Sequence, residues 1–422
     1  MKRLLLINDN QENQISYWHI AFFLMSLPFD RFYSEIVLIS FSLHILLHFT
    51  KSQIRGLLQK EVVILQSVFL LGIICIFYSA NKNQAIDDSI RQLSIFIFPL
   101  IFCLLRMDLS KYRFSLLLLF SIACTFSTIY LFADAIHTIL YYHLPLSSLS
   151  SSLFGNHNFS QPLDIHATYY SMYAAISCVF MLEELIKTKN KRYKIWYGSC
   201  CMILVAGLIQ LSSKSVFFAM LIILNLAFPF MLFKAKERLK FLVISSIFCI
   251  SIIVLILKIG DFKERYFINA KTDLTGTKNI ITDAEPRAER WEEALKIIKH
   301  SPIIGYGSGT ETELLKEKYF SEKMYTSYLN ELNAHDEYLS LMIKSGFIGL
   351  SVYLFVLFFG IKQAIKRSNL VFLSFLILTA TVSISENILD VNKGIFFYSF
   401  FFSFFIFSTV KNDQFSKKKT AL

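Results

Sequence analysis

Residues 214–259 hold two long apolar runs on either side of a basic cluster: KSVFFAMLIILNLAFPFMLF (214–233), KAKERLK (234–240) and FLVISSIFCISIIVLILKI (241–259). A transmembrane helix needs roughly 20 predominantly apolar residues, and both runs have about that length. Lys and Arg concentrate in cytoplasmic loops, where they set the orientation of membrane helices. The stretch therefore predicts two membrane helices joined by a short cytoplasmic loop.

Apolar runs of this kind recur along nearly the whole chain. Of the 422 residues, 55% are hydrophobic, and the mean hydropathy is +0.51. A soluble protein of this size could not bury so much apolar surface. We therefore predict an all-α polytopic membrane protein, a single integral membrane domain over residues 1–422 with about twelve transmembrane helices. The expected spans lie at about 15–29, 33–50, 61–80, 90–105, 114–141, 164–186, 195–212, 214–233, 240–259, 335–361, 369–388 and 394–410.

The loops between these runs alternate in charge, which predicts their sides of the membrane. Both ends of the chain are basic, whereas every second loop is neutral, mixed or acidic. The basic loops are 51–60, 106–113, 187–194, 234–240 and 362–368. We therefore expect both termini in the cytoplasm and two sizeable external segments, at about 142–163 and 260–334. The second is the one long loop, inserted between the ninth and tenth spans.

Several classes of function are excluded by what the chain lacks. The net charge of +11 comes from short clusters between apolar runs, and no basic face or aromatic-basic module indicates nucleic-acid binding. The seven cysteines all lie inside apolar runs, without zinc-finger spacing. No Walker A, GxGxxG, HExxH or GxSxG motif is present, so we expect no ATP, nicotinamide or other cofactor.

The centre of the long external loop, PRAERWEEALKIIKH (286–300), predicts an amphipathic helix that lies along the membrane surface or caps a cavity. Its expected apolar stripe is Trp291, Ala294, Leu295 and Ile298. Arg287 falls within about 40° of this stripe, which directs it toward the membrane or the cavity. Arg290 lies about 100° away from it and is expected to be solvated. The turn SPIIGYGSG (301–309) ends the helix.

Ionisable residues on the outer side are the candidates for chemistry, because such groups are costly near a membrane. These candidates are Lys214, His166, Arg91, Arg287, Arg290, His335 and Glu386. Each also has a structural explanation. His335 could belong to a helix start, since Asn333 and Asp336 suit capping. Lys214 could extend to lipid headgroups, and Arg287 could bind them.

Two further groups of residues have both a functional and a structural explanation. His166 and the pair Tyr169–Tyr170 begin a predicted span in LDIHATYYSMY (163–173), where the tyrosines could form an interfacial aromatic belt. Asp87 and Asp88 could bind a metal, but charges that complement a helix dipole explain them better. We therefore propose no metal site.

Four segments together resemble the bacterial O-antigen ligase and O-antigen polymerase superfamily. LSSKSVFFAML (211–221) resembles the family's outer "SR" turn, and PRAERWEEALKIIKHSPIIGYGSGT (286–310) its R-x-x-x-W helix followed by P-x-x-G-x-G. NAHDEYLSLMIKSGFIGL (333–350) resembles its H-N-x-Y-L…G-x-x-G-L segment, and ISENILDVNKGIFFYSFFFSFF (384–405) its final span pair. The resemblance covers roughly residues 150–410, and it is most specific between 286 and 350.

This resemblance implies a glycosyltransferase with a GT-C-like membrane fold and a large periplasmic loop at 260–334. The donor would be a glycan on undecaprenyl diphosphate, at the outer face of the bacterial inner membrane. Ligases pass the glycan to lipid A-core in lipopolysaccharide biosynthesis, whereas polymerases pass it to another lipid-linked repeat unit. Ligase and polymerase stay equally open. The family is independent of metal, and the transfer is expected to invert the anomeric centre.

The resemblance also implies roles for individual residues. The family's essential His falls on His335, and one essential Arg falls on Arg287. The other Arg is replaced by Lys214, and the Asn that follows the family's His is Asp336 here. His335 would accept the proton of the acceptor, and Arg287 and Lys214 would bind the diphosphate, with Arg290 beside them. The supporting residues would be His166, Tyr169, Asp336, Glu386 and Arg91.

Two rival functions compete with this interpretation. A transporter or lipid-glycan flippase fits the number of spans, but it should have two related halves and charged or broken helices near the midplane. Neither feature is visible, and the polar groups cluster at one face. A structural scaffold of the cell envelope would have no need of His335.

Overall fold

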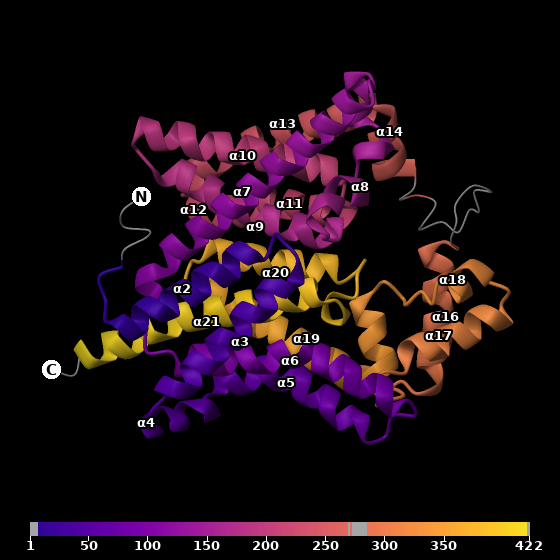
Figure 1. The fold of residues 1–422 in the computed structure, drawn as a ribbon, viewed down its shortest axis with the longest axis horizontal. Coiled ribbons are helices and arrows are strands. Elements are labelled where there is room, and N and C mark those ends of the chain that lie inside the picture. The colour runs from indigo at the N-terminus through magenta and orange to yellow at the C-terminus, as the bar shows by residue number, and fades with distance from the viewer. Residues whose placement is uncertain (1–6, 269–270, 272–284, 420–422) are drawn as a thin grey trace.

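The computed structural model describes residues 7–268, 271 and 285–419, and within these ranges the chain is helical, without strands. The long helices run roughly in one direction (Figure 1). Three shorter helices form a lobe at one end: α16 (Arg287–His300), α17 (Glu311–Ser321) and α18 (Tyr325–Leu329). The C-terminal end of α21 (Asn392–Lys419) and α4 (Lys51–Ile54) lie at the opposite end.

The remaining elements make up the bundle and its connections. The bundle helices are α2 (Gln11–Ser26), α3 (Arg31–His48), α5 (Lys60–Ile76), α6 (Lys82–Leu104), α7 (Leu109–Tyr141), α9 (Ala167–Lys187), α10 (Lys191–Leu211), α11 (Lys214–Ile222), α12 (Phe228–Leu232), α13 (Ala235–Lys258), α19 (Glu337–Lys366) and α20 (Leu370–Val382). Short connecting elements include α8 (His157–Ser160), α14 (Gly260–Lys263), the π-helical turn η6 (Glu264–Ile268) and the 3-10 turn η7 (Ile388–Asp390).

Polar residues between the apolar runs decide where many of these helices begin. An Asn or Asp side chain accepts a hydrogen bond from the first turn and so satisfies a backbone N–H that has no helical partner. Such caps are Asn10, Asp30, Asn81, Asp108, Asn190, Asp336 and Asn369. The caps let one helix follow another after only a few residues, which is what a tightly folded bundle requires.

Among the described residues, five helices are long and apolar enough to cross a membrane, or six if the bent pair His157–Leu163 and Ala167–Lys187 forms one span. The five are Leu109–Tyr141, Lys191–Leu211, Lys214–Leu232, Ala235–Lys258 and Glu337–Lys366. Lys214–Leu232 is one continuous helix that includes α11 and α12, joined by a π-helical turn over Ile223–Ala227. The predicted all-α membrane fold is confirmed at this level. Each of the twelve expected runs overlaps a helix, but the number of crossings stays a prediction.

Phenylalanines of α21 occupy the centre of the bundle. The Phe400 ring lies 4.9 Å from that of Phe23 on α2 and 5.3 Å from that of Phe98 on α6. Phe401 lies 5.1 Å from Phe120 on α7. These aromatic pairs add stability beyond their buried area. By contrast, α13 exposes many large apolar side chains, which suits a helix that faces lipid.

The lobe has its own small core, which corrects the predicted stripe of α16. Ala294, Ile297 and Ile298 are buried against α17 and α19, whereas Leu295 is exposed. Two partners therefore pack on α16, and its buried face is rotated from the predicted one. The buried residues of this core are Ala294, Ile297, Ile298, Leu315, Tyr319, Met324, Ala334 and Ile343.

The turn after α16 joins the lobe to the bundle by direct backbone contact. Tyr306 N donates to Ile343 O at 2.8 Å, and Phe347 N donates to Pro302 O at 2.8 Å. Gly305 and Gly346 have φ of +66° and +61°, and a Cβ on either would lie 2.5 Å or less from backbone of the other segment. Only glycine fits both the left-handed conformation and this close approach. The turn after α16 therefore packs directly on α19 at the kink at Gly346.

Candidate active site

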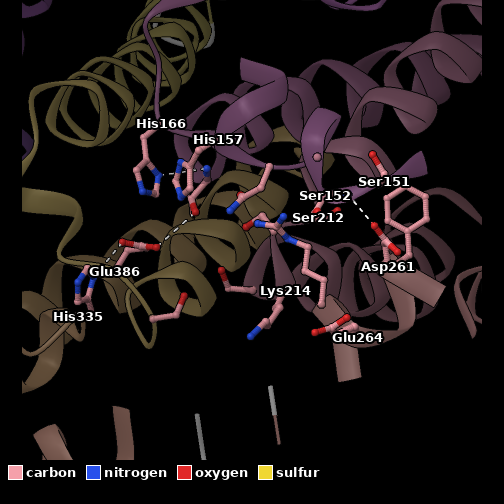
Figure 2. Close-up of a pocket in the computed structure, with 18 of the residues that line it drawn as sticks. Ser151, Ser152, His157, His166, Ser212, Lys214, Asp261, Glu264, His335 and Glu386 are labelled. Carbon is pink, nitrogen blue, oxygen red and sulfur yellow. Dashed lines mark hydrogen bonds and ion pairs between the residues drawn. The ribbon is translucent and has the colours of Figure 1, made fainter. Parts of the chain in front are cut away.

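A cavity of about 570 Å³ lies at the lobe end of the molecule, where several segments distant in sequence converge (Figure 2). Most of the residues that line it are polar or charged, and its walls come from residues 150–152, 155–157, 166, 168, 212–215, 261–262, 264–265, 287, 335 and 385–386. Five of the predicted site residues line it: His166, Lys214, Arg287, His335 and Glu386. The three residues given the central roles therefore share one cavity, together with two of the supporting residues.

His335 and Glu386 form a pair on one side of this cavity. Nδ1 of His335 lies 3.5 Å from Oε2 of Glu386 (Figure 2). His335 has a φ of +48°, in the left-handed region that most residues avoid. Strain of this kind persists only where the surroundings hold the residue in place.

The backbone on both sides of His335 supplies that restraint. Ala334 N donates to Glu311 Oε1 at 3.1 Å, and Ala334 O accepts from Trp291 Nε1 at 2.9 Å. Asp336 N donates to Asn387 Oδ1 at 2.9 Å, and the Asp336 carboxylate caps α19 by accepting from Leu339 N. α16, α17 and the segment after α20 thus fix the position of the imidazole.

Glu386 lies in the connection after α20 and is only 9% exposed. Its Oε1 accepts from Thr168 Oγ1 at 3.3 Å. Burial raises the pKa of the Glu386 carboxyl, but the hydrogen bond from His335 and the nearby His166, His335 and Arg287 bring the pKa below its ordinary value. Glu386 is therefore a carboxylate at neutral pH.

The two predicted diphosphate ligands line the cavity from different elements. Arg287 is the first residue of α16, and its Nη1 donates to Ser385 O at 3.0 Å, next to Glu386. Lys214 is the first residue of α11, directly after the sharp turn at Ser212, where φ is +52°. This turn reverses the chain between α10 and α11 and places Lys214 at the cavity.

Two further imidazoles form a contact near Glu386. The rings of His157 and His166 lie 4.2 Å apart between centroids, and both line the cavity. Nδ1 of His166 accepts from Thr168 N at 3.3 Å and so caps α9. Because Nδ1 accepts this bond, the proton of a neutral His166 resides on Nε2.

Four predicted site residues lie outside the cavity lining: Arg290, Asp336, Arg91 and Tyr169. Arg290, expected to be solvated, is instead 5% exposed, and its Nη1 donates to Asn333 O at 3.4 Å. It lies on the buried face of α16 because α17 and α19 both pack there. Asp336 caps α19, as described above. Arg91 on α6 donates to Asp390 O at 3.0 Å, away from the cavity.

The predicted aromatic belt at the start of α9 is wrong. Tyr169 and Tyr170 are 2% and 0% exposed. Tyr169 OH donates to Asn387 O at 3.4 Å, and the Tyr170 hydroxyl contacts Ser127 and Thr128 on α7 at 2.8 Å. These hydroxyls are thus held by partners inside the protein. Tyr169 thus contacts the backbone of Asn387, the residue after Glu386, and helps to hold that segment in place.

The aspartate pair on α6 has local partners. Asp88 Oδ1 accepts from Gln84 Nε2 at 2.8 Å and lies 3.8 Å from Arg91 Nη1. In the part of the chain that the structure describes, no group of three or more His, Cys, Asp or Glu residues could hold a metal ion.

A buried ionic network connects the segment that carries His335 with the segment that carries Glu386. Lys344 Nζ lies 2.8 Å from both carboxylate oxygens of Asp390 and 3.1 Å from Glu311 Oε2. Asn387 Nδ2 donates to Asp390 Oδ2 at 2.9 Å and to Glu311 Oε1 at 3.2 Å. Glu311 also holds Ala334, so one network restrains the backbone beside His335 and beside Glu386.

The sequence prediction missed several residues of the cavity wall. Arg265 and His157 line it, as do Asp261, Glu264 and serines from residues 150–152 and 212–215. One feature of the sequence could have indicated Arg265, because a basic residue on the expected outer side is against the usual trend. Ser150, Ser151, Ser152 and His157 lie in the polar segment 142–163, which carried no motif, whereas Ser212, Ser213 and Ser215 flank Lys214 in the segment 211–221.

Comparison with known proteins agrees with the family resemblance. Residues 196–354 match the family model described as O-antigen ligase. This range contains Lys214, Arg287 and His335, and the resemblance to the O-antigen ligase and polymerase superfamily is confirmed over it. The chain is also 30% identical over 109 residues to an uncharacterized protein of Haemophilus influenzae, which covers 25% of this chain and 27% of that relative. The match thus spans only about a quarter of the relative's length.

Proposed function

We propose that this protein is a metal-independent, inverting glycosyltransferase of surface-polysaccharide and O-antigen biosynthesis. It moves a glycan from undecaprenyl diphosphate to an acceptor at the periplasmic face of the bacterial inner membrane. The acceptor is lipid A-core for a ligase or another lipid-linked repeat unit for a polymerase. The observation that carries the proposal is the convergence of His335, Glu386, Arg287 and Lys214 on one cavity.

The proposed topology has about twelve spans in one membrane domain, both termini in the cytoplasm and residues 260–334 as the periplasmic loop. Two observations support it. The basic loops alternate along the chain. In addition, the C-terminal end of α21 lies at the end of the molecule opposite the α16–α18 lobe (Figure 1). The cavity then opens where a lipid-linked glycan presents its headgroup.

His335 is the proposed general base. A carboxylate that accepts from Nδ1–H leaves the lone pair of Nε2 available for a proton. The acceptor oxygen forms a bond to the anomeric carbon of the donor while its proton passes to Nε2 of His335. The bond between the anomeric carbon and the diphosphate oxygen breaks, and its electron pair stays on the diphosphate. Attack from the face opposite the leaving group inverts the anomeric centre.

Arg287 and Lys214 are the proposed ligands of the diphosphate. Charge accumulates on the leaving diphosphate as its bond to the sugar breaks, and fixed cations stabilise that charge without reorganisation. Arg can bind two phosphate oxygens with its planar fork, whereas Lys acts as a compact point charge. These two side chains reach the cavity from the lobe and from the bundle, so binding of the donor would also fix the lobe against the bundle.

Deletion of the gene tests this function and separates its two forms. Lipopolysaccharide without long chains, together with polymer that accumulates on the lipid carrier, would identify a ligase. A phenotype with single repeat units would identify a polymerase. A normal surface glycan in the deletion strain would contradict both forms.

A further inference from the structure

One cation of the cavity has no part in the reaction described above. Arg265 belongs to η6 and lines the cavity together with Asp261 and Glu264. In Figure 2, Asp261 and Glu264 lie on the other side of Lys214 from His335 and Glu386. The segment that carries Arg265 is thus a different wall from the one that carries the proposed base.

The neighbours of Arg265 hold this segment in place. Phe262 and Tyr266 are buried in an apolar cluster with Ile256. Tyr266 OH donates to Ile209 O at 3.4 Å, and its ring lies 5.4 Å from that of Phe217. Because both neighbours are anchored, the position of Arg265 at the cavity is set by the fold.

Arg265 lacks a counter-charge in the described part of the chain. It is half-buried, yet no carboxylate there lies within 4.0 Å of its guanidinium and no hydrogen bond from it is present. Asp261, which is close in sequence, accepts from Ser152 N at 2.7 Å instead. Burial lowers the pKa of the Arg265 guanidinium. A partly desolvated cation without a partner is costly, and an anionic ligand would offset that cost.

The surface beside Arg265 is rigid and rich in hydrogen-bonding groups. Gly155 adjoins the guanidinium, since a Cβ there would lie 3.6 Å from Arg265 Nη1. Buried Gln210 fixes this segment by donating to Leu149 O at 2.7 Å and accepting from Asn156 N at 3.0 Å. Hydroxyls of residues 150–152 line the cavity on this side. His157 lies between this side and Glu386, beside His166, and burial, His166 and the nearby Arg265 lower the pKa of its imidazole, so it is a neutral hydrogen-bonding group at neutral pH.

We propose that Arg265 and His157 form a second anion subsite, which binds a phosphate group of the acceptor lipid. This inference rests on the proposed glycosyl transfer, because a reaction between two lipids needs both headgroups in the cavity at once. The donor diphosphate occupies Arg287 and Lys214, and Arg265 binds the acceptor's phosphate on the other wall. The acceptor is therefore a phosphorylated glycolipid, either a polyprenyl diphosphate or a sugar phosphate.

Counting bound phosphate ligands tests this subsite. Radiolabelled farnesyl diphosphate would be titrated against the purified full chain in lipid nanodiscs, and the number of molecules bound per chain measured. We expect two for the native protein and one each for Arg265→Gln and Arg287→Gln. Lys263→Gln is the matched control, since this exposed lysine lies two residues away and outside the cavity lining, and it should keep two. Competition with galactose 1-phosphate identifies the source: displacement from the Arg265 subsite alone indicates a sugar phosphate, and no displacement indicates a polyprenyl diphosphate.

Binding of one molecule by the native protein, or of two by Arg265→Gln, would overturn the proposal. Thermal unfolding of Arg265→Gln should match that of the native protein, because Arg265 holds no described partner in place. The binding count does not depend on turnover. If the protein binds two molecules but has no transferase activity, the proposed function is rejected and the second subsite is kept. If it is an active transferase that binds only one molecule, the second subsite is rejected and the proposed function is kept.

Discussion

Nδ1 of His335 lies 3.5 Å from Oε2 of Glu386, although the two residues are on separate connections that approach the cavity from α17–α18 and from α20. A carboxylate in this position orients the imidazole and stabilises it once it has accepted a proton. The left-handed backbone at His335 is part of the same arrangement, because it turns the side chain toward Glu386 just before α19 begins.

Removing the imidazole should abolish most transfer without unfolding the protein. We expect His335→Ala to lower glycan transfer by about 10²–10⁴-fold, which is the usual contribution of a positioned base. His335→Asn is the matched variant, because Asn tolerates a positive φ that costs other residues roughly 1–2 kcal/mol. The measurement is transfer from purified lipid-linked glycan in liposomes. Near-normal transfer by a well-expressed His335→Ala protein would refute its role as base.

Lys344 should be essential to stability because it neutralises buried carboxylates. Lys344→Met leaves Glu311 and Asp390 without their cation, and removal of one partner of a buried ion pair typically costs about 3–5 kcal/mol. We expect a markedly lower unfolding temperature, with partial recovery in Lys344→Arg. Lys362→Met on the same helix is the control. Equal unfolding temperatures for the native protein and Lys344→Met would show that the network contributes little.

Features that depend on local sequence could be predicted, and features that depend on long-range contact could not. Apolar runs located the helices, and the family resemblance pointed to His335 and Arg287, which the fold brings to one cavity. The buried side of α16 was misjudged, since it depends on two packing partners that periodicity does not reveal. Likewise, Lys344 looks like an ordinary residue of an apolar helix. Its partners Glu311 and Asp390 are remote in sequence, so only the fold brings them together.

Glu285 provides a test of pH dependence outside the membrane helices. Its carboxylate accepts from Ser327 N at 2.8 Å and Thr326 N at 3.2 Å, which ties the start of α16 to α18. Burial raises the pKa of Glu285, but hydrogen bonds from Ser327 and the backbone bring the pKa below its ordinary value. A lowered folded-state pKa stabilises the lobe above the ordinary pKa, and this contribution disappears as the pH falls through the folded value.

We therefore expect the Thr326 and Ser327 amides to be protected from hydrogen exchange at pH 6–7, with protection declining below about pH 4 relative to the neighbouring helices. Glu285→Gln should remove that pH dependence and cost about 0.5–1.5 kcal/mol of local stability at neutral pH. Protection in Glu285→Gln that still falls in acid would assign the effect to another group.

Cysteine labelling tests the topology. An impermeant thiol reagent applied to intact spheroplasts should react with Ser150→Cys and Phe320→Cys, which lie on the cavity and lobe end. Asn190→Cys and Glu237→Cys lie in basic loops and should react only after the membrane is permeabilised. The native cysteines serve as background, because they are buried or partly buried within helices. Labelling of position 190 in intact spheroplasts would contradict the alternating assignment and place the cavity on the wrong side.

The last prediction concerns the contrast between Lys214 and Arg287. If Lys214 binds phosphate as a point charge, then Lys214→Arg should keep substantial transfer activity and Lys214→Gln should lose most of it. The loss corresponds to a charge-assisted hydrogen bond of about 1.5–3 kcal/mol, or roughly 10–150-fold in rate.

Arg287 should respond in the opposite way, because its guanidinium already uses Nη1 to bind Ser385 O at 3.0 Å while the side chain lines the cavity. Lys has no planar fork with which to keep the carbonyl bond and a phosphate contact together. Arg287→Lys should therefore be nearly as damaging as Arg287→Ala in the liposome transfer assay. Added chelator should leave the rates of all these proteins unchanged. An active Lys214→Gln protein would show that Lys214 only contacts lipid headgroups, and strict dependence on Mg²⁺ or Mn²⁺ would overturn the metal-independent mechanism.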